Sequence, residues 1–166
     1  MSEMPGIVHI RIDDRLLHGQ VVGMWTNTLQ ATRIMIPCDR VAEDEVLRKV
    51  LRMAAPAGVK TSFISAERAA RQIMEGRYEG QRVFMVCESP ADILKLMDLG
   101  LPITKINVGN IGGAEGRIAV KTSLSMSPEE AKMFHEIMDR GVEVTSQMVP
   151  AEPVSHLIDF MKEKGL

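Results

Sequence analysis

The residues best suited to chemistry stand together in one short segment, Asp13-Asp14-Arg15-Leu16-Leu17-His18-Gly19. It gathers two carboxylates, a guanidinium and an imidazole within six residues. A neutral imidazole can attack phosphorus, and a planar guanidinium can hold phosphoryl oxygens through paired hydrogen bonds. His18 is therefore a candidate nucleophile, with Arg15 as the group that stabilises charge.

This segment falls between a predicted strand and a predicted helix. Residues 7–12 alternate apolar and polar side chains, as a strand does, and residues 19–29 are typical of a helix. Ligands of open α/β sheets lie beyond the carboxyl ends of the strands. The amino end of the following helix offers free N–H groups and a positive dipole, which favours an anion such as phosphate and disfavours imidazolium. We therefore expect a neutral His18, with Asp14 or Asp13 fixing its tautomer.

The same segment also has a plainer interpretation. A single histidine in such a loop is often solvated or caps the helix, and Asp-Asp-Arg often forms a turn with a local ion pair. Position alone therefore predicts an anion site. It leaves open whether His18 is a catalyst or belongs to a non-catalytic module that binds an anionic metabolite.

Strand-like and helix-like segments alternate along the rest of the chain. This alternation predicts right-handed βαβ units and a mostly parallel sheet in one doubly wound α/β domain over residues 1–166. The further strands are predicted at 33–37, 60–64, 82–87, 105–108, 142–149 and in two short pieces within 118–126. The further helices are predicted at 43–54, from Ser65 to 74, from Ser89 to Gly100, from Ser127 to 140, and at 154–164.

Composition restricts the class of protein. The 166 residues are 45% hydrophobic and carry a net charge of -2, so there is no overall basic field for nucleic acid or an anionic membrane. No apolar run reaches the ~18 residues of a membrane span, and the N-terminus lacks the features of a signal peptide. We expect a cytoplasmic protein without direct membrane insertion. Cys38 and Cys87 have no CxxC spacing and are interpreted as reduced, partly buried thiols.

Residues after two later strands have both a binding and a structural interpretation. Asn107, Gly109 and Asn110 follow a strand expected to neighbour the first, so they could line a phosphate pocket or form a tight turn that needs glycine. Ser89 could contact phosphate, although a helix-capping role already explains it. Arg11 could join a basic rim that receives a partner, or simply face solvent.

Other motifs point away from nucleotides and metals. The glycines at 112, 113 and 116 lack the Gly-Lys-Ser/Thr ending of a P-loop, so nucleotide binding is not expected. The remaining histidines, His9, His135 and His156, show no metal-ligand spacing and are interpreted as structural. Trp25, two helical turns after His18, is expected in the core.

The run Arg11-Ile-Asp-Asp-Arg-Leu-Leu-His-Gly-Gln-Val21 closely resembles the signature of the EIIB component of the mannose family of phosphotransferase systems. That family includes mannose, fructose, sorbose and N-acetylgalactosamine transporters. Leu17 stands where the family commonly has Ile or Val. Weaker likenesses follow in order along nearly the whole chain, at Val41-Ala-Glu-Asp-Glu45, Ala54-Ala-Pro-Ala-Gly-Val59, Ser89-Pro90 and Ile106-Asn-Val-Gly-Asn110.

The resemblance implies a cytoplasmic phosphocarrier, held at the membrane through partners. Such a protein takes a phosphoryl group from a phosphohistidine of EIIA and gives it to a sugar that crosses the membrane through EIIC and EIID. The motif histidine, phosphorylated at Nδ1, falls on His18, and no cofactor or metal is expected. The implied fold is an open seven-stranded sheet, mainly parallel, with an antiparallel strand near one edge. We thus predict catalytic roles for His18, Arg15 and Asp14, and phosphate contacts from Asp13, Gly19, Gln20, Ser89, Asn107 and Gly109.

Overall fold

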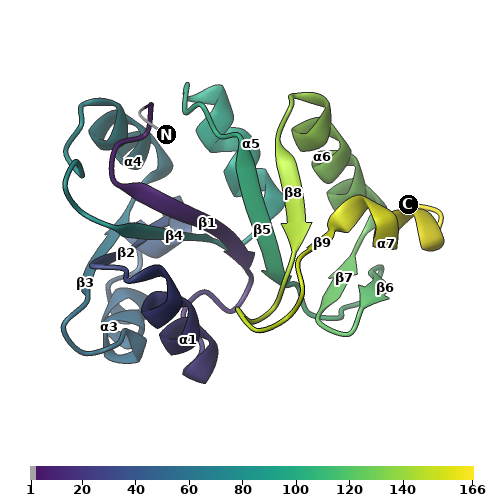
Figure 1. Ribbon diagram of the computed structural model, residues 1–166, viewed down its shortest axis with the longest axis horizontal. Helices are drawn as coiled ribbons and strands as arrows, with labels where there is room; N and C mark the ends of the chain where they lie inside the picture. Colours follow the sequence, from purple (N-terminus) through teal and green to yellow (C-terminus); the bar gives the residue numbers. More distant parts are fainter. Residues whose placement is uncertain (1–2) are drawn as a thin grey trace.

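The computed structural model describes residues 3–166 and has a seven-stranded sheet in the order β3-β2-β4-β1-β5-β8-β9 (Figure 1). Neighbouring strands pair in parallel except β8 and β9, which are antiparallel at the edge. The expected sheet type is therefore confirmed. The strands of this sheet are β1 (Ile7–Asp13), β2 (Arg33–Pro37), β3 (Lys60–Ile64), β4 (Val83–Cys87), β5 (Lys105–Asn110), β8 (Glu143–Ser146) and β9 (Ser155–His156). A separate antiparallel pair is formed by β6 (Ile118–Lys121) and β7 (Leu124–Met126).

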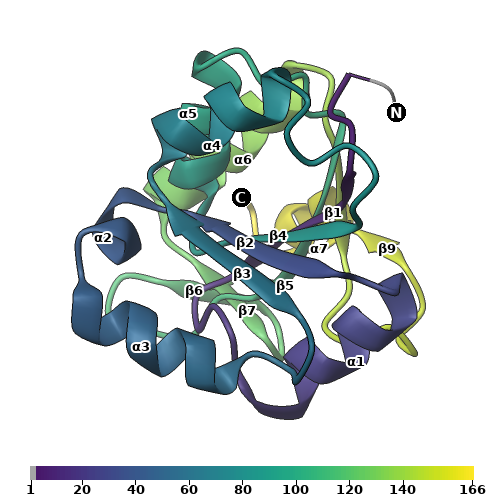
Figure 2. The same cartoon turned by 90° about the vertical axis from the view of Figure 1, so that its left-hand side faces the viewer.

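Helices cover the two faces of the sheet unequally. α1 and α3 lie on one face, whereas α4, α5 and α6 lie on the other (Figure 2). This distribution follows from right-handed crossovers that run one way along the sheet from β1 to β2 and β3, and the opposite way from β3 to β4, β5 and β8. The helices are α1 (Gly19–Leu29), α2 (Asp39–Ala42), α3 (Glu45–Ala54), α4 (Ala66–Met74), α5 (Pro90–Asp98), α6 (Pro128–Asp139) and α7 (Leu157–Glu163).

Local sequence signals explain the element boundaries. All five residues of β4 are buried because apolar layers cover both of its faces, which gives the strand its continuous apolar run. Ser65, Ser89 and Ser127 each accept a hydrogen bond from the backbone N–H three residues further on, so each begins a helix. At Ser127 the reciprocal bond from its own N–H to the Glu130 carboxylate completes a capping box.

Several boundaries differ from the sequence prediction. β5 continues past 108 to Asn110, so Gly109 lies within the strand and not in a tight turn. The predicted helix at 43–54 is preceded by α2 and starts at Glu45, because Asp44 caps it. The predicted strand at 142–149 ends at Ser146, because the next carbonyl, that of Gln147, accepts hydrogen bonds from Arg11 and Asn107. Residues 155–156 form β9 rather than the start of the last helix.

Cys38 and Cys87 are both buried and form no disulfide within residues 3–166, so their burial is complete rather than partial. Within residues 3–166, no helix combines the length and hydropathy that crossing a bilayer requires.

Candidate functional site

The segment from Asp13 to Gly19, which carries the candidate catalytic residues, lies where the carboxyl ends of β1 and β5 meet, near the middle of the sheet (Figure 1). From β1 the chain crosses toward β2 by way of α1, whereas from β5 it continues in the opposite direction toward β8. This point is a topological switch point, the place where doubly wound sheets bind ligands. The segment therefore lies at the carboxyl end of a central strand, as the sequence predicts.

Buried leucines hold the loop between β1 and α1 in place. Leu16 and Leu17 are each 5% exposed and pack into the apolar layer under α1, whereas His18 between them and the helix is exposed. Leu16 has a φ of 63°, a left-handed conformation that costs a non-glycine residue roughly 1–2 kcal/mol. Packing compensates this strain, and the result is a loop that presents His18 to solvent.

His18 occupies the N-cap position of α1, but its side chain makes no capping hydrogen bond. The first turn of α1 contains no acidic residue, whereas each of the other six helices has at least one. The positive end of α1 and its free N–H groups are thus left uncompensated. This helix terminus is suited to an external anion next to His18.

A buried ion network lies directly behind the loop. The Asp13 carboxylate accepts hydrogen bonds from Arg15 Nε at 3.0 Å and Arg15 Nη2 at 2.9 Å, and it also accepts one from Arg11 Nη2 at 3.2 Å. The Asp13 side chain is 3% exposed, whereas that of Arg15 is 26% exposed. Asp13 therefore holds the Arg15 guanidinium in a fixed plane. Its third nitrogen, Nη1, has no hydrogen-bond partner within residues 3–166.

Arg11 is only 2% exposed, so the expectation that it faces solvent or a partner is wrong. Its Nη1 donates to the Gln147 carbonyl at 2.9 Å, and its guanidinium lies 5.3 Å from the ring centre of Trp25. A Cβ atom at Gly109 would lie 1.9 Å from Arg11 Cζ, so this position can only be glycine while Arg11 keeps its place. Gly109 thus makes room for a buried guanidinium.

Asp14 points to the end of β5. Its carboxylate accepts hydrogen bonds from Asn110 Nδ2 at 2.9 Å and from the Gly112 N–H at 2.8 Å. Its own N–H donates to the Asn110 carbonyl at 3.0 Å. Asp14 therefore ties the loop to the strand that neighbours β1.

The predicted residues are brought together only in part. His18, Gly19 and Gln20 are exposed side by side, and Arg15 is partly exposed on the other side of the buried Leu16 and Leu17, with Asp13 behind it. The remaining predicted contacts are occupied elsewhere: Asn107 is 1% exposed and donates to the Gln147 carbonyl, and Ser89 caps α5 on the opposite face. Within residues 3–166, no hydrogen bond joins His18 to Asp13 or Asp14. Phosphate contacts from these residues stay a prediction.

The space underneath His18 cannot hold a phosphoryl group. A cavity of about 10 Å³ is lined by His18 together with Leu16 and residues of β1, α1 and β4, which is barely enough space for one water molecule. Any group bonded to His18 must therefore lie on the outer, solvent side of the loop.

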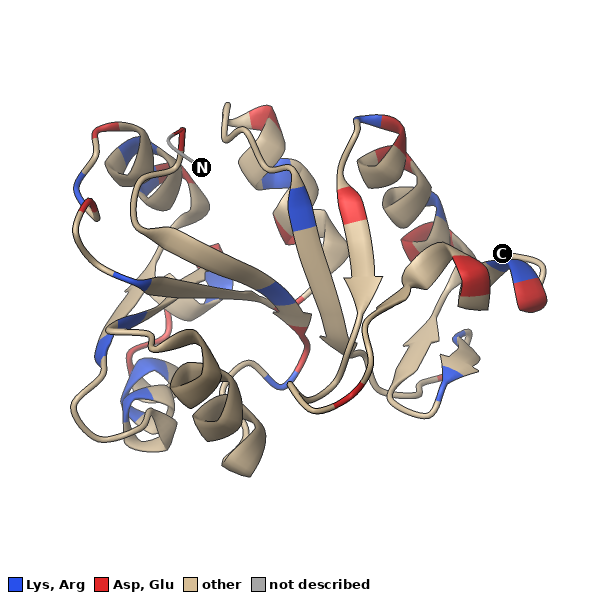
Figure 3. Cartoon of the chain, in the orientation of Figure 1, with Lys and Arg blue, Asp and Glu red and all other residues tan. Residues whose placement is uncertain are grey.

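Charge is distributed unevenly around this surface. Charged residues gather at the end of β1, whereas α1 beside it carries none (Figure 3). Neither the burial of Arg11 nor the hydrogen bonds to the Gln147 carbonyl were predicted from the sequence. A signal was present, because strand alternation places His9, Arg11 and Asp13 on one face of a central strand. Water cannot solvate all three side chains there, so they must interact with one another or with other protein groups.

Comparisons with known proteins assign the family. The family described as "PTS system sorbose subfamily IIB component" matches residues 7–166, and the chain belongs to it. This family membership makes it an EIIB-type component of a sugar phosphotransferase system, of the mannose family, as the signature around His18 predicted.

The named relatives are specific for several sugars. The "PTS system fructose-specific EIIB component" of Bacillus subtilis (strain 168) is 31% identical over 159 residues, which are 96% of this chain and 98% of that protein. The sorbose-specific EIIB component of Klebsiella pneumoniae is 34% identical over 153 residues, 92% of this chain and 93% of that one. The mannose-specific EIIAB component of Escherichia coli (strain K12) is 31% identical, and the match spans 92% of this chain but 47% of that relative. The crystal structure of the IIBSor domain of the Klebsiella pneumoniae sorbose permease superimposes with a TM-score of 0.89 at 34% identity, covering 95% of this chain and 96% of that one.

Proposed function

We propose that this chain is a phosphocarrier that accepts a phosphoryl group on Nδ1 of His18 from a phosphohistidine of EIIA. It then passes the group to a sugar during uptake through EIIC and EIID. The observation that carries the proposal is the exposed His18 at the uncompensated amino end of α1, beside a guanidinium fixed by a buried carboxylate. Family membership supports the same reaction class.

The proposed transfer is a displacement at phosphorus. The lone pair on Nδ1 of the neutral His18 ring attacks the phosphorus, the donor's N–P bond breaks, and its electron pair returns to the donor imidazole. In the second step a sugar hydroxyl oxygen attacks the phosphorus, the His18 N–P bond breaks and its electron pair returns to the His18 ring, and the hydroxyl proton passes to solvent. Because imidazole is both donor and acceptor in the first step, that step is close to balanced in free energy.

The chain's own groups stabilise the charge that develops on the phosphoryl oxygens. Arg15 offers Nη1, since Asp13 already occupies its Nε and Nη2. The free N–H groups of the first turn of α1, from Gly19 onward, offer further donors without any reorganisation. Asp14 acts as a positioning residue, because it ties the loop to Asn110 and Gly112.

Partner docking is proposed at the uncharged face of α1 around His18. Met24 of this helix is 41% exposed, and its neighbours carry no charge, so a partner needs little desolvation of ions there. The donor and acceptor bind in turn at one place, so each contact is expected to be small and transient. A relative named as an EIIAB component supports EIIA as the donor, since the name joins both components. We propose a cytoplasmic protein that is peripheral to the membrane through EIIC and EIID.

The experiment is incubation with phosphorylated EIIA, followed by intact mass measurement at neutral pH. Wild type is expected to gain one phosphoryl group that is lost in acid and kept in base, and His18→Gln is expected to gain none. His156→Gln is the matched control, because His156 is also an exposed histidine at a helix N-cap without a capping bond. Absence of label on wild type, or equal labelling of His18→Gln, contradicts the proposal and favours a non-catalytic anion-binding module.

A further inference from the structure

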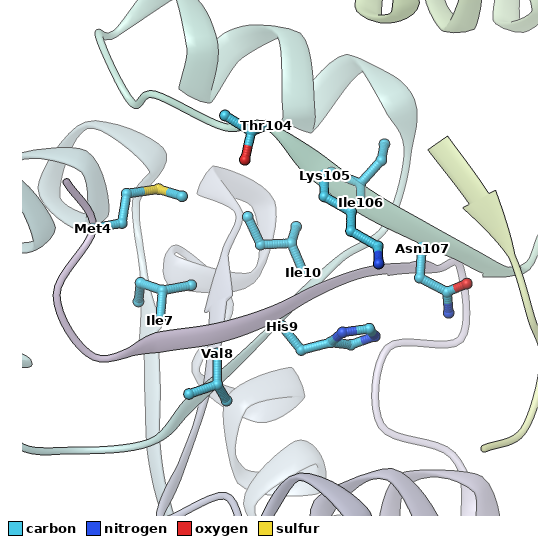
Figure 4. A pocket seen from close by; sticks show the side chains of 9 residues that line it. All are labelled: Met4, Ile7, Val8, His9, Ile10, Thr104, Lys105, Ile106 and Asn107. Carbon is cyan, nitrogen blue, oxygen red and sulfur yellow. The ribbon is translucent and has the colours of Figure 1, made fainter. Parts of the chain in front are cut away.

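A second cavity lies between β1 and β5, toward their amino ends and away from His18. Its volume is about 230 Å³, just below the ~300–1,000 Å³ of drug-sized ligand sites. Its walls are the side chains and backbone of residues 4, 7–10 and 104–107, drawn in Figure 4. The cavity has the size for a small organic molecule of a few carbon atoms.

The cavity exists because the two strands diverge. β1 pairs with β4 from Ile7 onward, but its pairing with β5 starts only at Arg11, opposite Asn107 (Figure 1). Within residues 3–166, no helix covers this opening on the α1 side of the sheet, since α1 packs against β4 and β1 (Figures 1 and 2). The wedge between the strands is therefore open to small molecules.

The cavity has an apolar end and a polar end. Met4, Ile7 and Val8 gather toward one side, and Lys105, His9 and Asn107 toward the other (Figure 4). The amide of Asn107 is already used by the Gln147 carbonyl and the Thr145 hydroxyl. Lys105 and His9 are the groups left to contact a ligand.

Lys105 provides a positive charge without a protein counter-ion. Within residues 3–166 its ammonium makes no hydrogen bond and no ion pair. The nearest acid in the strand register is Glu143 of β8, whose carboxylate instead lies 3.6 Å from His156 Nε2. An anion at the polar end would therefore meet an uncommitted ammonium.

His9 provides a neutral hydrogen-bond donor next to that charge. Burial, with the charges of Arg11 and Lys105, lowers the pKa of His9 to about 4, so the ring is neutral at pH 7. Its Nε2 is the one side-chain polar atom that is buried without a partner in residues 3–166. A bare acceptor is less unfavourable there than an orphaned N–H, which favours the tautomer with the proton on Nδ1. That proton is then available to an anion beside Lys105.

We propose that this cavity is a binding site for a small aliphatic carboxylate, with the hydrocarbon chain toward Met4 and Ile7 and the carboxylate toward Lys105 and His9. The site is separate from the phosphoryl site, and the proposal does not depend on His18. His9 stacks on Trp25 at 4.8 Å between ring centres, so the single tryptophan of the chain reports on the cavity.

The test is a titration of the full chain with hexanoate, followed by the methyl NMR signals of Met4, Ile7 and Ile10 and the indole N–H signal of Trp25. Saturable shifts are expected with hexanoate. Hexanol and hexylammonium should bind at least about tenfold more weakly, because a hydrogen bond to a charged group contributes on that order. Lys105→Gln should weaken hexanoate about tenfold, and His9→Phe, which keeps an aromatic ring against Trp25, should also weaken it.

Two controls separate this site from other sites. Lys60→Gln removes another exposed lysine at the first position of a strand and should leave hexanoate binding unchanged. His18→Gln should also leave it unchanged, and inorganic phosphate should not compete. The proposal is overturned if hexanoate gives no saturable shift up to its solubility limit. It is equally overturned if hexanol binds as well, or if Lys105→Gln has no more effect than Lys60→Gln.

Discussion

Gly109→Ala is the substitution for which the structure gives the sharpest expectation. The new Cβ atom would lie 1.9–2.1 Å from three atoms of the Arg11 guanidinium, so the guanidinium must leave its position. It would then lose its part-buried hydrogen bond to the Gln147 carbonyl and its buried one to Asp13. The backbone φ of Gly109 is not in the left-handed region, so the clash, and not strain, carries the effect.

The magnitude follows from the lost contacts. A hydrogen bond to a charged group contributes about 1.5–3 kcal/mol, and forced repacking of a filled core costs about 1–3 kcal/mol. Partial relaxation recovers some of this, so we expect a loss of about 4 kcal/mol in the free energy of unfolding. That is a large fraction of the ~5–15 kcal/mol by which domains are stable.

Urea denaturation provides the measurement, with the midpoint expected to fall and the m-value to stay the same. Gly23→Ala is the matched control, because no atom lies within 4 Å of its Cβ in α1, and there alanine should stabilise by up to ~1 kcal/mol. In an Arg11→Met background the cost of Gly109→Ala should drop below ~1 kcal/mol, since the two changes share one contact. The reasoning would be refuted if Gly109→Ala lowered the free energy of unfolding by less than ~1 kcal/mol in wild type, or by the same amount in wild type and in the Arg11→Met background.

Three further predictions concern rate, pH dependence and capping. Arg15→Lys should slow phosphoryl uptake from EIIA at least about tenfold in a quench-flow assay, because an ammonium cannot bind Asp13 in a fork and a phosphoryl oxygen together. As the pH falls from 6.5 to 4, the free energy of unfolding of wild type should fall by up to about 3 kcal/mol relative to that of His9→Phe. The reason is that His9 takes up a proton in this range only in the unfolded state. Burial raises the pKa of Asp92 to about 6 and acts with the opposite sign in the same range, so only the difference between the two urea series is diagnostic. Ser127→Ala should lower the free energy of unfolding, measured by urea denaturation, by about 1 kcal/mol, because the capping box is lost.

The architecture could be predicted from sequence because local signals and hydrophobic periodicity agree along most of the chain. The bounds of α1, β2 and β3 match the predicted ranges, and the serine caps of α4, α5 and α6 are where the sequence places them. Such signals depend on residues within about one helical turn in the sequence, so they can be identified without knowledge of the tertiary structure. The boundaries that failed, at 147–149 and 155–156, are set by Arg11 and by pairing with β8, which are long-range contacts.

The site was predicted as a segment but not as a set of contacts. Adjacency in sequence places Arg15 and His18 together, and the strand–loop–helix order predicts the anion-binding terminus. Side-chain partners are a different matter. Asp13 and Asp14 are adjacent in sequence, yet one is buried against two arginines and the other reaches across to Asn110. The pleat of β1 and the position of β5 determine which aspartate binds the arginines and which one binds Asn110.

The central claim is that a phosphoryl group resides on one particular nitrogen. The most direct test is ¹⁵N–³¹P coupling in the ¹⁵N-labelled chain after phosphorylation by EIIA, with the histidine ring systems assigned. A single N–P coupling at Nδ1 of His18, lost in His18→Gln, is the predicted result. Coupling at Nε2 of His18, at another histidine, or at no nitrogen would contradict the account.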